Sequence, residues 1–113
     1  LEDVQDRCIA ISFDAEACRI ARAAGGLPIG WVLHDTPQAS LAALEDLQPQ
    51  YVFCDQRLLP PSGPLPQGPW DWVVYEVTDA PGALRLCAQG VTMIETMVPA
   101  RLMRELAGTV GPA

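Results

Sequence analysis

The stretch WVVYEVTDAPGALRLCAQGVTMIETMVPARLMREL, which runs from Trp72 to Leu106, decides the fold class. Its first segment, Trp72–Val77, is a continuous run of apolar, aromatic and β-branched residues, typical of a strand buried on both faces of a parallel sheet. Val91–Glu95 predicts the next strand. Strands that alternate with helices lie parallel, because each helix carries the chain back across the sheet. The stretch therefore predicts an α/β fold.

The residues between these strands mark the ends of helices. Asp79 is a favoured N-cap residue, Pro81 suits a first helical turn, and Gly90 is typical of the residue that ends a helix. Pro99 begins the last predicted helix. Chemistry in such folds gathers at the carboxyl ends of the strands. The candidates there are Glu76, Thr78, Glu95 and Thr96.

The first half of the chain repeats the alternation of strands and helices. Three apolar segments predict strands, at Cys8–Phe13, Leu27–Leu33 and Gln50–Asp55, and Asp14 and Thr36 stand where N-caps are expected. The chain thus offers five strand candidates, whereas half of an eight-stranded barrel needs four. The sequence leaves this count ambiguous by one.

A proline-rich loop, Gln56–Pro69, separates the third and fourth predicted strands. It contains five of the eleven prolines of the chain, which favours a semi-rigid loop over a helix. It is either a linker between two βα units or a lid beside a site, since long loops in compact domains are often functional. Trp70, just after it, is the best candidate to anchor the loop to the sheet.

Composition limits the possible partners. The 113 residues carry fourteen acidic and seven basic side chains, and the net charge of −7 argues against a nucleic-acid surface. No apolar stretch is long enough to span a membrane, and no signal peptide is recognisable. The four cysteines follow no metal-binding spacing and lie in apolar segments, which predicts buried, reduced thiols and a cytoplasmic location. Because the chain begins with Leu1 rather than methionine, we expect it to be a piece of a longer protein.

Three motifs resemble the last βα units of the glycerophosphodiester phosphodiesterase family, whose closing pattern is roughly W-T-V-N-D, a helix, and G-V-D-G-I-x-T-D. Val74–Asp79 (VYEVTD) resembles the first part and Gly90–Met97 (GVTMIETM) the second, while Ile11–Asp14 (ISFD) resembles the serine-phenylalanine strand ending of that family. The resemblance covers nearly the whole chain and implies a single partial domain, residues 1–113, that forms the C-terminal half of a (β/α)₈ TIM barrel. Glu76 stands where the family usually has threonine, and Met97 where it has aspartate.

The resemblance implies a parent enzyme, a phosphoric diester hydrolase of lipid metabolism. It would hydrolyse glycerophosphodiesters to glycerol 3-phosphate and an alcohol, using two histidines and a divalent metal, Mg²⁺ or Ca²⁺. The family's H-R-G and E-x-D motifs are missing, and His34 is the only histidine of the chain. We therefore expect no catalytic residue and no metal ligand here, and no activity of the chain alone.

Four residues are the candidate substrate-binding set: Phe13, Tyr75, Glu76 and Glu95. The two aromatic side chains would form an apolar wall for glycerol or the alcohol, or would instead fill the barrel core. Glu76 would hydrogen-bond the glycerol end, or would cap a helix or pair with an arginine. His34 is interpreted as a loop residue at a strand end, or as a residue of the pocket rim, and the other carboxylates at strand ends are Asp14, Asp35 and Asp55.

A half-barrel leaves its concave face and two strand edges unpaired. The expected apolar residues of that face are Ile11, Val32, Val74 and Ile94. The expected partner is the N-terminal half of the barrel or a second copy of the chain, besides the small-molecule substrate. The alternative is a small self-contained α/β interaction or regulatory domain without enzymatic activity.

Overall fold

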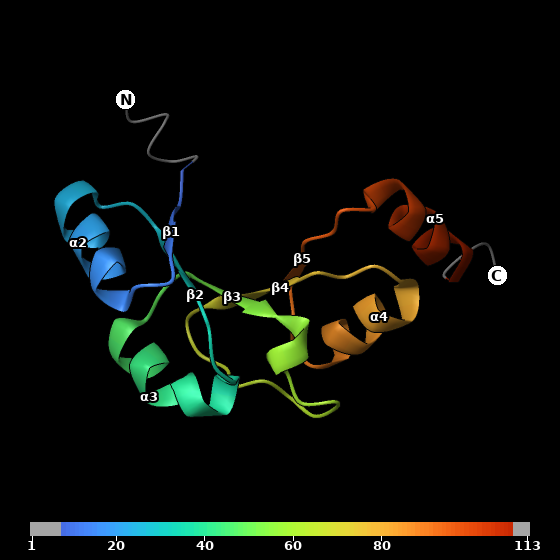
Figure 1. Cartoon of the computed structure of the whole chain (residues 1–113), viewed down its shortest axis with the longest axis horizontal. Helices are drawn as coiled ribbons and strands as arrows, with labels where there is room; N and C mark the ends of the chain where they lie inside the picture. Colours follow the sequence, from blue (N-terminus) through green and yellow to red (C-terminus); the bar gives the residue numbers. More distant parts are fainter. Residues whose placement is uncertain (1–7, 110–113) are drawn as a thin grey trace.

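Residues 8–109 are described by the computed structural model, and they form an α/β fold built on one parallel sheet (Figure 1). The five strands are β1 (Ala10–Ser12), β2 (Ile29–Val32), β3 (Tyr51–Asp55), β4 (Asp71–Tyr75) and β5 (Met93–Ile94). They lie side by side in chain order, and every neighbouring pair is parallel. The predicted parallel α/β architecture is confirmed, and the strand count is five.

The helices begin where the sequence places their caps. They are α2 (Ala15–Gly25), α3 (Pro37–Leu47), the 3₁₀ turn η1 (Gln56–Leu58), α4 (Ala80–Ala88) and α5 (Pro99–Thr109). The Asp14 and Asp79 carboxylates and the Thr36 hydroxyl each accept a hydrogen bond from a backbone N–H in the following turn, at 2.8–3.2 Å. These bonds satisfy N–H groups that the helices themselves leave unpaired.

The strands are shorter than their apolar runs. The run that ends at Val77 forms pairs only up to Tyr75, and β5 contains two residues of the predicted five. β1 and β5 are the edges of the sheet and pair on one side only. An edge strand has a hydrogen-bonded neighbour on one side only, so apolar residues at the ends of β5 continue as loop.

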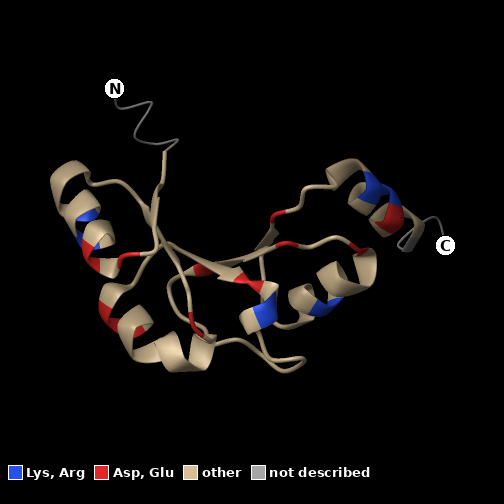
Figure 2. Cartoon of the chain, viewed as in Figure 1, with Lys and Arg blue, Asp and Glu red and all other residues tan. Residues whose placement is uncertain are grey.

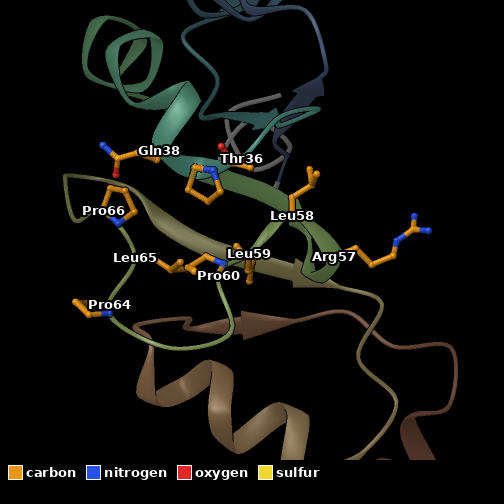
Figure 3. A pocket seen from close by; sticks show the side chains of 10 residues that line it. Thr36, Gln38, Arg57, Leu58, Leu59, Pro60, Pro64, Leu65 and Pro66 are labelled. Atoms are coloured by element: carbon orange, nitrogen blue, oxygen red, sulfur yellow. The ribbon is translucent and has the colours of Figure 1, made fainter.

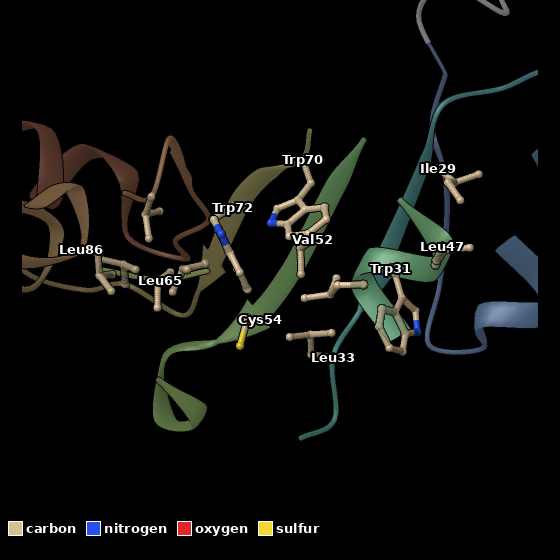
Figure 4. Close-up of a cluster of buried hydrophobic side chains, with 14 of the residues drawn as sticks. Ile29, Trp31, Leu33, Leu47, Val52, Cys54, Leu65, Trp70, Trp72 and Leu86 are labelled. Atoms are coloured by element: carbon tan, nitrogen blue, oxygen red, sulfur yellow. The ribbon is translucent and has the colours of Figure 1, made fainter. Parts of the chain in front are cut away.

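One face of the sheet carries the hydrophobic core. Alternate strand residues point to this face and pack against residues of all four α-helices and of the proline-rich loop. Figure 4 shows part of this core, including Leu47 of α3, Leu86 of α4 and Leu65 of the loop. The strand residues of this core are Ile29, Trp31, Val52, Cys54, Trp72 and Val74. Figure 1 shows α2 and α3 beside the N-terminal strands and α4 and α5 beside the C-terminal ones.

The proline-rich loop takes the place of a covering helix between β3 and β4. Leu65 and Trp70 are buried in the core, and Trp70 donates a hydrogen bond from Nε1 to the Pro66 carbonyl at 3.3 Å. The buried Gln89 side chain donates from Nε2 to the carbonyls of Pro60 and Gly63. Trp70 is therefore the anchor that its position predicts, and the loop covers the sheet.

Within residues 8–109, no helix packs against the opposite face of the sheet, because all four α-helices contribute to the core on the first face. Ile11 and Val32 lie on this face, as predicted, beside Phe53. The prediction is wrong for Val74 and Ile94, which pair with each other and pack in the core on the helix side. The error has a simple cause, since side chains alternate along a strand and an offset of one residue reverses the face.

Two of the four cysteines also differ from the prediction. Cys18 and Cys54 are buried, whereas Cys8 and Cys87 are exposed free thiols. On α4 the buried positions are Ala80, Ala83 and Leu86, three residues apart. Cys87 follows the last of them by one position, about 100° further around the helix, and so faces solvent.

Candidate functional site

Acidic residues collect at the carboxyl ends of the strands. Six carboxylates lie at this edge: Asp55 is the last residue of β3, and the loops after the other strands contain Asp14, Asp35, Glu76, Asp79 and Glu95. The six described arginines all lie in helical segments, and η1 carries the one nearest the end of β3 (Figure 2). This edge of the sheet is therefore predominantly negative.

Two adjoining hollows open at this edge, on the uncovered side of the sheet. The first, which we call the aromatic hollow, has a volume of about 440 Å³. Its lining residues are Ile11, Phe13, Val32, Phe53, Tyr75 and Glu95. The second, the polar hollow, measures about 360 Å³ and includes His34, Asp55 and Arg57. Phe13 and Tyr75 line both, so these two rings separate the hollows.

Three of the four predicted substrate-binding residues come together in the aromatic hollow. Phe13, just after β1, is 61 % exposed, so it is not a core residue. Tyr75 ends β4 and is half-buried, and Glu95 follows β5 with its side chain exposed. Backbone hydrogen bonds from Glu95 N to Val74 O (2.9 Å) and from Val77 N to Glu95 O (3.1 Å) fix Glu95 beside the end of β4.

Glu76 lies outside both hollows. Its Oε2 accepts a hydrogen bond from the backbone N–H of Met97 at 2.8 Å, two residues before α5. The Glu76 carbonyl in turn accepts a hydrogen bond from the side-chain amide of Gln56. Glu76 thus connects the end of β4 to the β5–α5 loop and to η1.

Asp55 and Arg57 form an ion pair in the polar hollow. Arg57 Nη2 lies 2.6 Å from Asp55 Oδ2, and Nε lies 3.1 Å from both carboxylate oxygens. The Arg57 backbone N–H also donates to Oδ1 at 2.9 Å. These hydrogen bonds to the charged form lower the pKa of Asp55, so it stays ionised near neutral pH.

The Tyr75 phenol is held in its neutral form. Burial raises its pKa, and the nearby negative charges of Asp55 and Glu95 add to the shift. At physiological pH it therefore keeps a proton that it can donate, while its ring offers a flat apolar face. No other described tyrosine lines either hollow.

Sequence reasoning missed Phe53 and the pairing of Asp55 with Arg57. Phe53 lies in the middle of β3, and the sequence alone does not show on which face of the sheet its ring lies. The ion pair could have been predicted from the sequence, because Asp55 ends a predicted strand and an arginine follows two residues later. His34 lies in the loop after β2, as expected, at the side of the polar hollow.

A third pocket lies between the start of α3 and the proline-rich loop, and it shares Arg57 and Leu58 with the polar hollow (Figure 3). It measures about 510 Å³ and is lined mainly by prolines and leucines, with Thr36, Gln38 and Arg57 as its polar residues. It is the largest pocket of those described, but it contains no carboxylate, histidine or cysteine. Its composition suits packing better than chemistry.

The described residues do not form a metal centre. Within residues 8–109, no group of three or more histidine, cysteine, aspartate or glutamate side chains is arranged to hold a metal ion. In the same part of the chain, no helix is both long and apolar enough to cross a membrane.

Comparisons with protein-family models, with curated proteins and with solved structures found no match. The function must therefore be argued from the residues and their geometry.

Proposed function

We propose that this chain forms the C-terminal part of a (β/α)₈ barrel of the glycerophosphodiester phosphodiesterase type and supplies one wall of its substrate site. The sheet is consistent with this, because its strands follow one another in chain order with helices on one face, as in barrels of this class. Five strands are present, so a closed barrel would take three more from outside the chain.

One observation supports the proposal above all others. Phe13, Tyr75 and Glu95 come from the three separate motifs that resemble the family, and they line the same hollow at the carboxyl edge. Motifs far apart in sequence that meet at the edge where barrel enzymes bind substrate are more readily explained by a shared ligand than by packing.

The proposed reaction is hydrolysis of a glycerophosphodiester to glycerol 3-phosphate and an alcohol. The divalent metal implied by the resemblance does not fit the described residues, which offer no set of ligands for it. A two-histidine acid–base mechanism also cannot be built around His34 alone. We therefore assign this chain substrate contacts, at Phe13, Tyr75 and Glu95, and leave the catalytic groups to the rest of a cytoplasmic parent enzyme.

The test is to read the coding sequence upstream of Leu1 and to assay the longest protein it encodes. We expect that protein to carry H-R-G and E-x-D motifs and to hydrolyse glycerophosphocholine with Mg²⁺ or Ca²⁺, and the 113-residue chain alone to be inactive. Tyr75→Ala should raise KM more than it lowers kcat, since the ring contacts substrate but moves no proton. The matched control is Glu45→Gln on the exposed side of α3.

Two results would contradict the proposal. One is a start codon immediately before Leu1, and the other is hydrolysis by the purified chain that disappears in His34→Ala. Either result favours a self-contained α/β interaction domain, or a different chemistry on the same fold. The observation in favour of an interaction domain is the uncovered apolar face, on which Ile11 is 52 % exposed.

A further inference from the structure

We infer that the pocket between α3 and the proline-rich loop binds an uncharged aromatic ring compound that carries a hydroxyl or a ring N–H. This binding role goes beyond the proposed function and does not depend on it. The pocket offers apolar packing and no catalytic group, which suits a binding site and not a reaction. Its walls belong to elements that pack on the helix side of the sheet, so association through the uncovered face leaves it open.

The pocket exists because a loop takes the place of a helix. Each of the other three connections between neighbouring strands contains an α-helix, whereas the chain between β3 and β4 crosses as the proline-rich loop, which begins with η1. Leu65 and Trp70 of this loop reach the core, and a space of about 510 Å³ remains between the loop and the first turn of α3 (Figure 3). Small-molecule sites in proteins measure about 300–1,000 Å³, so the space is large enough for a ring compound.

The walls of the pocket are fixed before a ligand binds. Four of its ten lining residues are prolines, whose rings restrict the backbone angle φ. The buried Gln89 side chain, just after α4, also holds the loop: its Nε2 donates to the carbonyls of Pro60 at 3.0 Å and Gly63 at 3.2 Å. The Leu65 N–H donates to the Gln89 carbonyl at 3.0 Å. A ligand therefore does not have to order the loop, and this lowers the entropic cost of binding.

The apolar lining favours an aromatic ring over a saturated one. It consists of three leucines and four prolines: Leu58, Leu59, Leu65, Pro37, Pro60, Pro64 and Pro66. The C–H groups beside a proline nitrogen carry a small positive charge, and the face of an aromatic ring carries negative potential. Proline rings therefore attract aromatic faces, in addition to the burial of apolar surface that any ring of this size would provide.

Two neutral side chains supply the hydrogen-bonding groups of the pocket. Thr36 Oγ1 accepts a hydrogen bond from the Ala39 N–H at 3.2 Å, and its hydroxyl proton has no acceptor among residues 8–109. The exposed Gln38 side-chain amide makes no hydrogen bond within the same residues. A ligand hydroxyl can accept from Thr36, and a ligand hydroxyl or ring N–H can donate to the Gln38 carbonyl.

The charges around the pocket disfavour an ionic ligand. No carboxylate of residues 8–109 lines it, so a cation would find no partner. Arg57 is the one charged lining residue, but its Nε and Nη2 donate to Asp55, and Figure 3 shows its side chain extending away from Pro60 and Pro66. An anion would lose hydration against the apolar walls without an unpaired cation to replace it. An uncharged ring compound avoids this cost.

The experiment compares ligands that differ in aromaticity or in charge. The 113-residue chain is titrated with 2-naphthol and with decahydro-2-naphthol, the saturated compound with the same ring skeleton and hydroxyl. NMR follows the methyl signals of Leu59 and Leu65 and the side-chain amide of Gln38. We expect 2-naphthol to bind with a Kd below about 1 mM, at least about threefold more tightly than the saturated compound. The anion 2-naphthoate should bind at least about fivefold more weakly than 2-naphthol.

Three results would overturn the inference. The first is the absence of a saturable shift at Leu59 and Leu65 with 2-naphthol. The second is equal or tighter binding of the saturated compound or of 2-naphthoate. The third is a set of shifts centred on Ile11, which would place the ligand in the aromatic hollow instead of this pocket.

Variants test whether the pocket itself binds the ligand. Leu59→Ala removes part of the apolar wall and should weaken 2-naphthol binding about fivefold. Leu84→Ala, the same change at an exposed position on α4, should leave binding unchanged. Gln38→Ala should weaken binding about two- to threefold, whereas Glu45→Ala on the same helix should not. Because Gln38 is exposed, its variant keeps the test decisive even if Leu59→Ala does not fold. Parent-like binding by natively folded Gln38→Ala and Leu59→Ala would show that the ligand does not occupy this pocket.

Discussion

The Phe53 ring lies directly over Gly30 on the uncovered face of the sheet. A Cβ atom at residue 30 would come within 2.5 Å of Phe53 Cε1 and 3.4 Å of Ile11 Cγ1. Gly30 and Tyr51 are register partners in β2 and β3, and Phe53 is paired with Val32 two residues further along. The missing side chain of Gly30 therefore makes the space that lets Phe53 form the floor of the aromatic hollow.

Gly30→Ala tests this relationship. The added methyl group must push the Phe53 ring away from the sheet, and we expect a loss of about 1–2 kcal/mol in the free energy of unfolding, as in other overpacked sites. The measurement is urea unfolding followed by far-UV circular dichroism. Gly108→Ala is the matched control, because nothing lies within 4 Å of its Cβ and α5 should gain about 0.5–1 kcal/mol. Equal stability of the two variants would contradict the placement of Phe53.

The lowered pKa of Asp55 gives a prediction about pH. Because its native pKa lies below its ordinary value of 3.8, ionised Asp55 stabilises the fold fully above that pH. The contribution disappears as the pH falls below 3.8 and through the native pKa. Arg57→Met should return the pKa of Asp55 toward 3.8, as measured by NMR titration of its carboxyl carbon. The Arg57 side chain is largely exposed, so its loss should change the free energy of unfolding only slightly.

The cysteines should react in two classes. Cys8 and Cys87 are exposed, whereas Cys18 and Cys54 are buried, and burial raises the pKa of Cys54 to about 12. Iodoacetamide at neutral pH should therefore label the first two in the native chain, and all four only after unfolding. Mass spectrometry without reductant counts the labels. Two or more cysteines that resist labelling until reductant is added would instead indicate a disulfide, contrary to the reduced state expected here.

The uncovered face and the two edge strands predict association of the isolated chain. Within residues 8–109, β1 and β5 each pair on one side only and leave their other backbone edge unpaired, and Ile11 in β1 and Phe13 just after it are exposed. We expect a homodimer at micromolar concentration in sedimentation experiments, or tight binding to the N-terminal part of the proposed barrel, supplied separately.

Ile11→Glu should shift the chain toward monomer with little loss of stability, because Ile11 is already 52 % exposed. Ile20→Glu, the same change at a 61 % exposed position on α2, serves as a control away from the uncovered face and the edge strands. A soluble monomer that unfolds cooperatively and binds no hydrophobic dye would show that the chain is a self-sufficient domain and would exclude the partial-barrel proposal.

The sequence by itself determined the order of strands and helices. Apolar runs alternate with capped segments, and a cap such as Asp14 or Asp79 acts on N–H groups only two or three residues away. Such signals are local and can be read without knowing the fold. They were sufficient to predict a parallel sheet and to place Phe13, Tyr75 and Glu95 at its carboxyl edge.

Only the tertiary structure decided which side chains share a face and which groups meet. Val74 packs against the helices and Phe53 lies on the other side, because the pairing of each strand with its neighbours sets the register, and one residue of offset reverses every side chain. The hydrogen bond that the Met97 backbone N–H donates to the Glu76 carboxylate spans 21 residues and holds the Glu76 side chain outside the hollows. Contacts between distant segments depend on how the whole sheet assembles, and no local pattern encodes them.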